Sequence, residues 1–363
     1  MEDIKIDEIA NVLRADILNL CHAIGLQGKT DGNDFVAYNP TRADKHLGSF
    51  RVCIRGAKQG IWAEFASGER GDPLDLINYC LFRNQTNKHE AIEWAKQYLG
   101  LNSNHKGDLE KVKQRAAEQQ KKAEEEQKKE NEFFKRRAQK IFLSADPLIK
   151  NTPAEKYFNN RGIDFSVLGK YPHTLRYEKN CYYEKDKKTG ETIYMPAIIA
   201  AVNNENGEFV AIHRTFLENI NGIWKRKNKK VLGAFAGAAI RLWRGKTRLP
   251  IEKLKATANL DEVDKTLIIC EGIEDGLSIA MACPEYRLWT SLSVSNMKNI
   301  KIPSIFKTVI IAGDNDGEEH IATVHVQQAA EAFQRQGFEV KIARPEYAHD
   351  FNDELTGKDY KHS

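Results

Sequence analysis

The chain has 363 residues, of which 41% are hydrophobic and 29% are charged, and its formal net charge is +4. This length allows two or three domains, and this balance of residues is typical of a globular protein. No apolar run approaches the length of a membrane span, and the six cysteines form no Cys-x-x-Cys pair. We therefore expect a cytoplasmic protein without membrane contact, whose cysteines stay reduced.

The first hundred residues have the pattern of a small α+β domain. Residues 4–20 place apolar side chains at helical spacing, so a helix should open the chain. Short strands are expected at 34–38, 49–54 and 60–65, and helices at 73–81 and 88–99. The candidate core of this domain consists of Phe35, Phe50, Trp62, Phe65, Leu74, Leu76, Ile77 and Trp94.

Two strings in this region resemble the zinc-ribbon domain that begins DnaG-type primases: Gly-Ser-Phe-Arg-Val at 48–52, and the run from Trp62 to Ile77 that contains Gly-Asp-Pro-Leu. The positions of the four zinc ligands then fall on Asn39, Arg42, Glu64 and Ser67. None of these is a thiol or an imidazole, so we expect a degenerate ribbon that binds no zinc and depends on its apolar core. The resemblance also implies DNA contacts by Arg42, Arg51, Arg55 and Arg70.

Residues 103–140 differ in composition from what precedes and follows them. Glu, Lys, Gln and Ala dominate, and no large apolar residue occurs between Val112 and Phe133. A coiled coil needs apolar heptads, which are absent here. We expect a charged, solvated helical linker between two domains.

The next segment is strongly basic. Residues 141–255 carry 21 Lys and Arg against 11 Asp and Glu, whereas residues 256–363 carry 10 against 18. A basic region beside an acidic one suits an enzyme that handles a polyanion and uses cations. The same charges could also form an ordinary solvated surface.

Three features of the basic segment point to a nucleic-acid enzyme. Residues 153–164, which contain Lys-Tyr-Phe-Asn-Asn-Arg-Gly, resemble the helix that opens the polymerase core of DnaG-type primases. A hairpin is expected from 194–202 and 208–215, and a Lys- and Arg-rich run follows at 225–230. The resemblance implies that basic residues here bind phosphates of template and nucleotide: Arg214, Lys229, Lys230, Arg241 and Arg244. His213 is interpreted as a strand residue.

Two apolar runs in the last hundred residues end abruptly in acid and glycine. These runs, at 266–270 and 308–312, suit strands buried on both faces of a parallel sheet. Adjacent strands of an open α/β sheet share one crevice at their carboxyl ends, so Glu271, Asp314 and Asp316 should converge. Converging carboxylates repel one another unless a cation lies between them, and hard oxygen ligands suit Mg²⁺ or Mn²⁺.

Gly-Asp-Asn-Asp-Gly at 313–317 could instead be an ordinary turn, because Asn, Asp and Gly all tolerate turn geometry. It fits a calcium-binding EF-hand loop poorly, because that loop has its glycine at the sixth position, whereas Gly317 is the fourth residue from Asp314. The second acidic strand end at Glu271, with a helix-like segment at 275–282 after it, favours the metal site over the turn.

Glu-Gly after one strand and Asp-x-Asp after the next but one resemble the signature of the Toprim domain, which DnaG-type primases share with topoisomerases, OLD-type nucleases and RecR-like repair proteins. The catalytic residues implied are Glu271, Asp314 and Asp316, and the metal ligands implied are Asp314, Asp316, Asp350 and Asp275. Asp350 belongs to His-Asp-Phe-Asn-Asp at 349–353, which resembles a primase segment with a further acidic pair. Asn352 stands where the second aspartate of that pair is expected, and Asp353 could substitute for it.

The chain outside the linker thus resembles a primase in its order of domains. We expect a small α+β degenerate zinc-ribbon-like domain (1–102), the helical linker (103–140), an α+β basic subdomain (141–258) and a Toprim domain (259–363). The Toprim domain should be α/β and Rossmann-like, with a mostly parallel sheet.

The resemblance implies a DNA primase-like nucleotidyltransferase that makes short primers on single-stranded DNA from nucleoside triphosphates, with Mg²⁺ or Mn²⁺ as cofactor. Glu271 would act as a general base or as a further metal ligand. A replicative helicase or a single-strand-binding protein could be a partner. Degenerate ribbons occur in primase-like proteins of plasmids and phages, so replication of a mobile element is the expected setting.

Two other functions fit the same residues. A Toprim-type nuclease uses the same acids to cleave DNA, and a non-catalytic replication accessory protein could keep the fold and bind DNA only. The missing zinc ligands and Asn352 keep the accessory protein as an alternative to the active enzyme. A topoisomerase also needs a separate DNA-gate domain with a tyrosine nucleophile, for which the chain has too few residues left.

Overall fold

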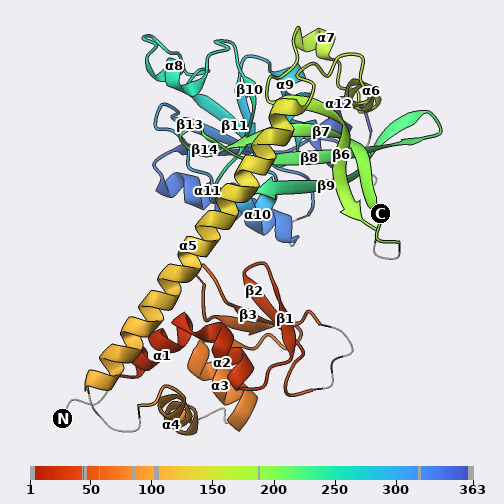
Figure 1. Ribbon diagram of the computed structural model, residues 1–363. Helices are drawn as coiled ribbons and strands as arrows, with labels where there is room; N and C mark the ends of the chain where they lie inside the picture. Colours follow the sequence, from red (N-terminus) through yellow and green to blue (C-terminus); the bar gives the residue numbers. More distant parts are fainter. Residues whose placement is uncertain are drawn as a thin grey trace. The chain divides into compact units, whose positions relative to one another are not determined.

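A computed structural model describes residues 5–358, except 43, 45–46, 57, 84–86, 102–105, 187–188 and 318–319. Within residues 106–123, side chains are described only at 114, 117–118 and 121–122. The chain forms two compact units, residues 1–129 and residues 130–363. We call them unit 1 and unit 2 and describe each by itself (Figure 1).

Unit 1 combines an antiparallel sheet with short helices. Its strands, in the order in which they pair, are β1 (Gly28–Asp31), β2 (Asp34–Ala37), β3 (Phe50–Cys53), β4 (Trp62–Glu64) and β5 (Arg70–Gly71). Its short helices are α1 (Ile6–Ala15), α2 (Ile17–Ala23), α3 (Pro73–Ile77), the π-helix η1 (Asn78–Phe82) and α4 (His89–Tyr98). The one helix expected over 4–20 is divided at Asp16, where the backbone leaves the helical conformation.

The core of unit 1 lies between the sheet and the helices, and most of the expected core residues belong to it. Phe65 does not, because its side chain is 70% exposed. Side chains alternate between the two faces of a strand, and Trp62 and Glu64 take the inward positions of β4. Phe65 is therefore on the outward side, and a carboxylate occupies the place where an apolar residue was expected. Trp94 is only partly buried at the edge of this core.

The linker is helical, as its composition predicts. Helix α5 runs from Lys106 to Ser144, and its last turns belong to unit 2, where Ala138 is buried in a small apolar cluster with Ile199, Ile212 and Phe216. No described helix of the chain is both long enough and apolar enough to cross a bilayer.

Unit 2 begins with two short helices and a four-stranded antiparallel sheet, sheet B. The helices are α6 (Pro153–Asn160) and α7 (Phe165–Leu168). The strands pair in chain order: β6 (Leu175–Lys185), β7 (Thr192–Asn203), β8 (Phe209–Ile220) and β9 (Ile223–Gly233). The predicted hairpin is β7 and β8, whereas β6 and β9 were not predicted as strands.

The rest of unit 2 forms sheet C with helices on both faces. Its strand order is β10–β12–β11–β13–β14, in which β10 (Ile240–Arg244) is antiparallel to β12 (Arg287–Thr290). The other strands are parallel: β11 (Thr266–Cys270), β12, β13 (Thr308–Ala312) and β14 (Glu339–Ala343). The helices are α8 (Ile251–Lys255), α9 (Ile273–Ala282), α10 (Val294–Met297), α11 (Ile321–Arg335) and α12 (Phe351–Leu355).

Alternate residues of β11 enter two different cores. Ile268 and Cys270 pack in the core that includes α9, and Leu267 and Ile269 pack in the core that includes α11. This explains why the strand reads as an unbroken apolar run, because both of its faces are buried. The α/β fold with a mostly parallel sheet is confirmed.

Candidate active site

Strands β11 and β13 are neighbours and parallel, with Ile269 opposite Ile311. Glu271 follows the first strand, and Asp314 and Asp316 follow the second. The predicted convergence of these side chains at one edge of the sheet is therefore present in the fold. Glu271, Asp314 and Asp316 line the same cavity of about 10 Å³, which is roughly the room that one water molecule needs.

Two glycines allow helix α9 to start directly behind Glu271. A Cβ on Gly272 would lie 2.8 Å from Oδ2 of Asp275, and a Cβ on Gly276 would lie 2.7 Å from a methyl carbon of Leu242. A Cβ on Gly272 would displace the carboxylate of Asp275, and a Cβ on Gly276 would collide with the packed core side chains of Leu242 and Leu288. The close packing brings Asp275, in the first turn of α9, to the strand ends.

The Asp-Asn-Asp loop is fixed by its middle residue. Nδ2 of Asn315 donates hydrogen bonds to the carbonyl oxygens of Pro345 and Ala348, both at 2.8 Å. The backbone N–H of Asn315 donates to the carbonyl oxygen of His349. Nε2 of His349 lies 3.2 Å from Oδ1 of Asp316. The loop after β13 and the segment before α12 therefore form one rigid support for the acids.

Asp350 is the N-cap of α12, where its Oδ1 accepts the backbone N–H of Asp353 at 2.7 Å. The side chain of Asp353 makes an ion pair with Lys358 at 3.1 Å. That pairing gives Asp353 a local partner, and its role as a substitute ligand stays a prediction. Asp350 interacts electrostatically with Asp275 and Asp314.

Asn352 is fully buried and joins three segments of unit 2. Its Nδ2 donates to the carbonyl oxygen of Arg161 at 2.7 Å and to Oγ of Ser278 at 2.9 Å, and its backbone N–H donates to Oδ1 of Asp275 at 3.3 Å. An aspartate could not donate those two side-chain hydrogen bonds. Asparagine at this position therefore has a structural role that ties α12 to α9 and to the end of α6.

We call Glu271, Asp275, Asp314, Asp316 and Asp350 the acidic centre. Burial, together with the charges of Asp350 and Asp314, raises the pKa of Asp275 to about 7. Burial also raises the pKa of Asp314 to about 6, with contributions from Glu271 and Asp316. The pKa of Glu271 is raised mainly by burial, although Lys229 opposes this shift. The centre therefore holds negative charge that the surrounding chain compensates only in part.

This donor set fits a hard divalent cation, because all of its members are carboxylates on or near strand ends. Within the described residues, no group of three Asp, Glu, His or Cys side chains is already arranged to hold an ion. Two arguments support a metal at this centre: carboxylate oxygens suit a hard cation, and a cation would relieve the repulsion between them.

A second carboxylate in α9 was not predicted. Glu274 is 4% exposed. Its Oε1 accepts hydrogen bonds from the hydroxyl of Tyr157 at 2.5 Å and from Nη1 of Arg226 at 3.3 Å, and Lys229 lies 4.0 Å from its Oε2. Burial alone would raise the pKa of Glu274, but Lys229, Tyr157 and Arg226 together lower it to about 2. The sequence signal was its place next to Asp275, in the first turn of a helix that follows a buried strand.

A β-bulge brings Arg226 and Lys229 to the same face of sheet B. Phe216 of β8 is opposite Asn228, and Leu217 is opposite Arg226, so Lys227 is an extra residue in β9. Without the bulge, residues 226 and 229 would point to opposite faces, because side chains alternate along a strand. The bulge resets the alternation, and both side chains reach Glu274.

Arg214 and Lys230 are opposite each other in β8 and β9, on the other face of sheet B from Lys229. Nη1 of Arg214 donates to the carbonyl oxygen of Tyr182 at 3.2 Å. Nζ of Lys230 lies 3.8 Å from the ring centre of Tyr183 and 3.0 Å from Oε2 of Glu184. Of the three basic residues predicted here, the structure brings only Lys229 to the acidic centre.

The remaining predicted basic residues lie away from the acidic centre, and His213 is buried behind Lys229. Arg241 and Arg244 line a separate cavity, whose lining includes none of the acidic centre. His213 is buried on the same face of β8 as Thr215, and burial lowers its pKa to about 4, with a further contribution from Lys229. It is a neutral strand residue behind Lys229.

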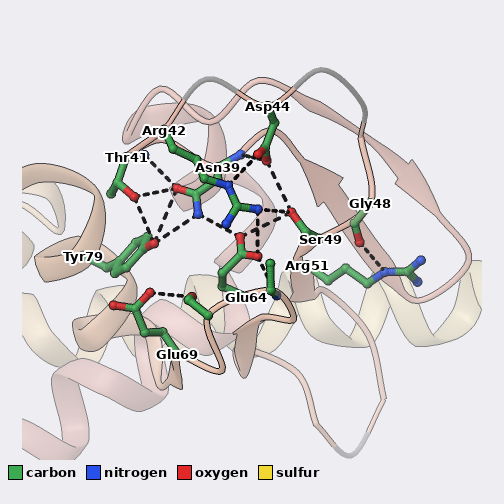
Figure 2. Close-up of polar contacts among 12 residues, drawn as sticks. Asn39, Thr41, Arg42, Asp44, Gly48, Ser49, Arg51, Glu64, Glu69 and Tyr79 are labelled. Atoms are coloured by element: carbon green, nitrogen blue, oxygen red, sulfur yellow. Dashed lines mark hydrogen bonds and ion pairs between the residues drawn. The ribbon is translucent and has the colours of Figure 1, made fainter.

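In unit 1, three of the four zinc-ligand positions meet around one carboxylate. Glu64 is fully buried, and its oxygens accept hydrogen bonds from Nδ2 of Asn39 at 2.8 Å and from Nη2 of Arg42 at 3.2 Å. Figure 2 shows these side chains together with Ser49, Asp44 and Tyr79. The fourth position, Ser67, donates instead to Glu69 at 2.7 Å. We call the group around Glu64 the Glu64 network.

Comparison with family models identifies two segments. Residues 266–359 match the model of the Toprim domain. The chain therefore contains a Toprim domain. Sheet C and the acidic centre lie in it, apart from the antiparallel edge strand β10. Residues 133–242, which include sheet B, match a family described as a domain of unknown function, DUF7146.

Solved primase structures also resemble the chain. The zinc-binding and RNA polymerase domains of the *Aquifex aeolicus* primase share 16% identity over 98% of this chain and 83% of that chain, with a TM-score of 0.37. A DNA primase domain from *Pseudomonas aeruginosa* shares 11% identity over 62% and 75%, with a TM-score of 0.39. A DnaG primase catalytic domain bound to single-stranded DNA shares 12% over 63% and 76%, with a TM-score of 0.41. No curated protein matches the sequence.

Proposed function

We propose that this chain is a primase-like nucleotidyltransferase that synthesises short primers on single-stranded DNA from nucleoside triphosphates. The observation that carries the proposal is the acidic centre of the Toprim domain, with one lysine of sheet B beside it. Glu271 interacts electrostatically with Lys229 as well as with Asp275 and Asp316. The degenerate ribbon supports a plasmid or phage as the setting, where a helicase or a single-strand-binding protein would be a partner.

In this proposal, the chain supplies a base and a phosphate contact. The 3′-hydroxyl oxygen of the primer attacks the α-phosphorus of the incoming triphosphate, the bond to the bridging oxygen breaks, and pyrophosphate leaves. Glu271 accepts the hydroxyl proton, and its raised pKa makes it a better acceptor than an exposed carboxylate. Lys229 contacts the triphosphate, while Glu274 fixes the position of that lysine. Tyr157 and Arg226 hold Glu274 in turn.

Asp314, Asp316, Asp350 and Asp275 would hold Mg²⁺ or Mn²⁺. A bound divalent cation would supply charge neutralisation for the triphosphate and lower the pKa of the hydroxyl. Glu271 could be a further ligand.

Primer synthesis tests the proposal directly. Purified protein is incubated with single-stranded DNA, labelled nucleoside triphosphates and Mg²⁺, beside an Asp314→Asn/Asp316→Asn double variant. The matched control is Glu331→Gln, which removes an exposed carboxylate from α11. Short labelled products from the unaltered protein and the control, but not from the double variant, are expected.

Two other outcomes would contradict the proposal. A metal-dependent nick in the template without labelled products would identify a nuclease that uses the same acids. An intact template that is bound equally well by the unaltered protein and the double variant would identify an accessory protein.

A further inference from the structure

A second site in unit 2 carries the opposite charge from the acidic centre. A cavity of about 500 Å³ is lined by the loop before β6, the turn between β7 and β8, strand β10, the start of α8 and Arg287 of β12. We call it the cationic cavity. Its charged lining residues are Lys170, Arg241, Arg244 and Arg287, against Glu208 and Glu252, and His173 also lines it.

Arg287 is buried, and its hydrogen bonds in the described part of the chain are to neutral groups, although Asp264 and Glu252 interact with it electrostatically. Its Nη2 donates to the carbonyl oxygen of Leu249 at 2.8 Å and to Oγ1 of Thr247 at 3.4 Å. Burial, together with Arg244 and Arg241, lowers the pKa of Arg287 to about 10. A buried guanidinium without a carboxylate at ion-pair distance is costly unless an anion binds it.

Arg241 is held at the wall of the cavity with donor capacity left over. Its Nη2 donates to the carbonyl oxygens of Asn204 and Glu205, at 3.0 and 3.1 Å, and its Nη1 lies 3.6 Å from Oε1 of Glu252. Its buried Nε has no hydrogen-bond partner among the described residues. Gly207 leaves room for the guanidinium, because a Cβ there would lie 2.9 Å from Nη1.

The rim of the cavity adds two more cations. Arg244 is exposed, and no carboxylate of the described chain lies within ion-pair distance of it. Nζ of Lys170 lies 4.5 Å from the ring centre of Trp243, and burial lowers its pKa, as do Arg248 and Arg244. Of the two carboxylates, Glu208 is hydrogen bonded to Asn204. Positive charge therefore exceeds negative charge in and around the cavity.

We propose that the cationic cavity binds a phosphate-bearing ligand of nucleotide size, at a site separate from the acidic centre. Several guanidinium groups that converge on one space suit phosphate oxygens, which they contact in pairs. The volume is in the usual range for small-molecule sites. The phosphate could belong to a free nucleotide or to a nucleic-acid strand. The site does not depend on the proposed polymerase chemistry, because none of its residues belongs to the acidic centre.

Binding without catalysis tests this site. The full chain in EDTA is titrated with ATP and, separately, with a short oligothymidylate, and binding is measured by calorimetry. Arg244→Gln should weaken binding at least tenfold, and it should leave the fold intact because the side chain is exposed. Lys170→Gln is a second variant at the rim. The matched control, Arg335→Gln at an exposed arginine of α11, should bind as the unaltered protein does. Lys229→Gln, beside the acidic centre, reports any ATP that binds there instead.

The two probes separate the two sources of phosphate. If the variants Arg244→Gln and Lys170→Gln lose ATP binding alone, the site is assigned to a free nucleotide. If they lose oligothymidylate binding, it is assigned to a nucleic-acid strand. The proposal is overturned if Arg244→Gln and Lys170→Gln bind both probes as Arg335→Gln does, or if neither probe binds the unaltered protein. Loss of ATP binding in Lys229→Gln alone would also overturn it, because the ligand would then lie at the acidic centre.

Discussion

Glu64 in unit 1 and Asp275 in unit 2 are both carboxylates removed from water, but their surroundings differ. Glu64 accepts hydrogen bonds from Asn39, Arg42 and the backbone N–H of Ala66. Asp275 has Asp350 and Asp314 as electrostatic neighbours, and one backbone N–H as a donor. Glu64 has a cation and neutral donors as partners, whereas the acidic centre is left in need of a cation. Burial of acids alone therefore does not identify a metal site; the partners of those acids do.

Removal of one acid from the acidic centre tests this difference most strongly. Asp314→Asn should lower primer synthesis at least about 1,000-fold, a loss of roughly 4 kcal/mol of transition-state stabilisation. The same change should raise the melting temperature in EDTA by a few degrees, because Asn relieves repulsion with Glu271 and Asp316. Activity assays and thermal unfolding measure the two effects. A lower melting temperature would show that Asp314 is compensated in the folded chain.

The corresponding change in the Glu64 network should have the opposite effect on stability. Glu64→Gln leaves Arg42 and Asn39 without their shared acceptor charge, and it should lower the free energy of unfolding of unit 1 by about 2 kcal/mol. Glu69→Gln, at an exposed acid nearby, is the control. Because the network occupies three of the four ligand positions, EDTA should not change the denaturation midpoint of unit 1. A large shift with EDTA would mean that a metal contributes to this fold.

Lys229 and Lys230 are adjacent in sequence and on opposite faces of sheet B, so they make a matched pair. Lys229→Gln should reduce the rate at least about 10-fold, because it removes a cation that interacts with both Glu271 and Glu274. Lys230→Gln should change the rate less than about threefold. Steady-state kinetics with varied triphosphate concentration distinguish these outcomes. Equal losses would show that the face of the strand does not matter.

Adjacent residues of α9 should have opposite effects on the pH dependence of stability without metal. Glu274 has a lowered pKa, so its contribution is present above about pH 4.5 and is lost as the pH falls toward about 2. Asp275 has a raised pKa, so the folded state loses stability as the pH rises from about 4 to about 7. Each limb should amount to about 1–2 kcal/mol. Thermal unfolding in EDTA should show Asp275→Asn flattening the upper limb and Glu274→Gln the lower one.

The sequence predicted those parts of the molecule that depend on local pattern. Apolar runs that end in acid and glycine gave the two parallel strands and the convergence of Glu271 with Asp314 and Asp316. The zinc-ligand positions gave residues that do meet around Glu64, except Ser67. These features follow from strand ends and from short spacing along the chain.

The parts that were missed depend on contacts between distant segments. Glu274 meets Tyr157 and Arg226, which lie 117 and 48 residues away. Neither pairing leaves a trace in the local pattern. Glu64 is buried and Phe65 is exposed, the reverse of what was expected. A buried carboxylate can be predicted at a core position only when its hydrogen-bond partners are known, and here they come from distant residues such as Asn39.

The extra residue in β9 also has a consequence for insertions and deletions. Removal of Lys227 alone would keep Arg226, Lys229 and Glu274 in the chain, and it would delete only a side chain that pairs with Glu218 on the surface. The strand could then pair without its bulge, because Arg226 would directly precede Asn228 and would still be opposite Leu217. Arg226 and Lys229 would be two residues apart and would stay on one face of the sheet. The site therefore depends on the pairing partners of these two basic residues, and related chains that lack the extra residue would be expected to keep both of them without a second change.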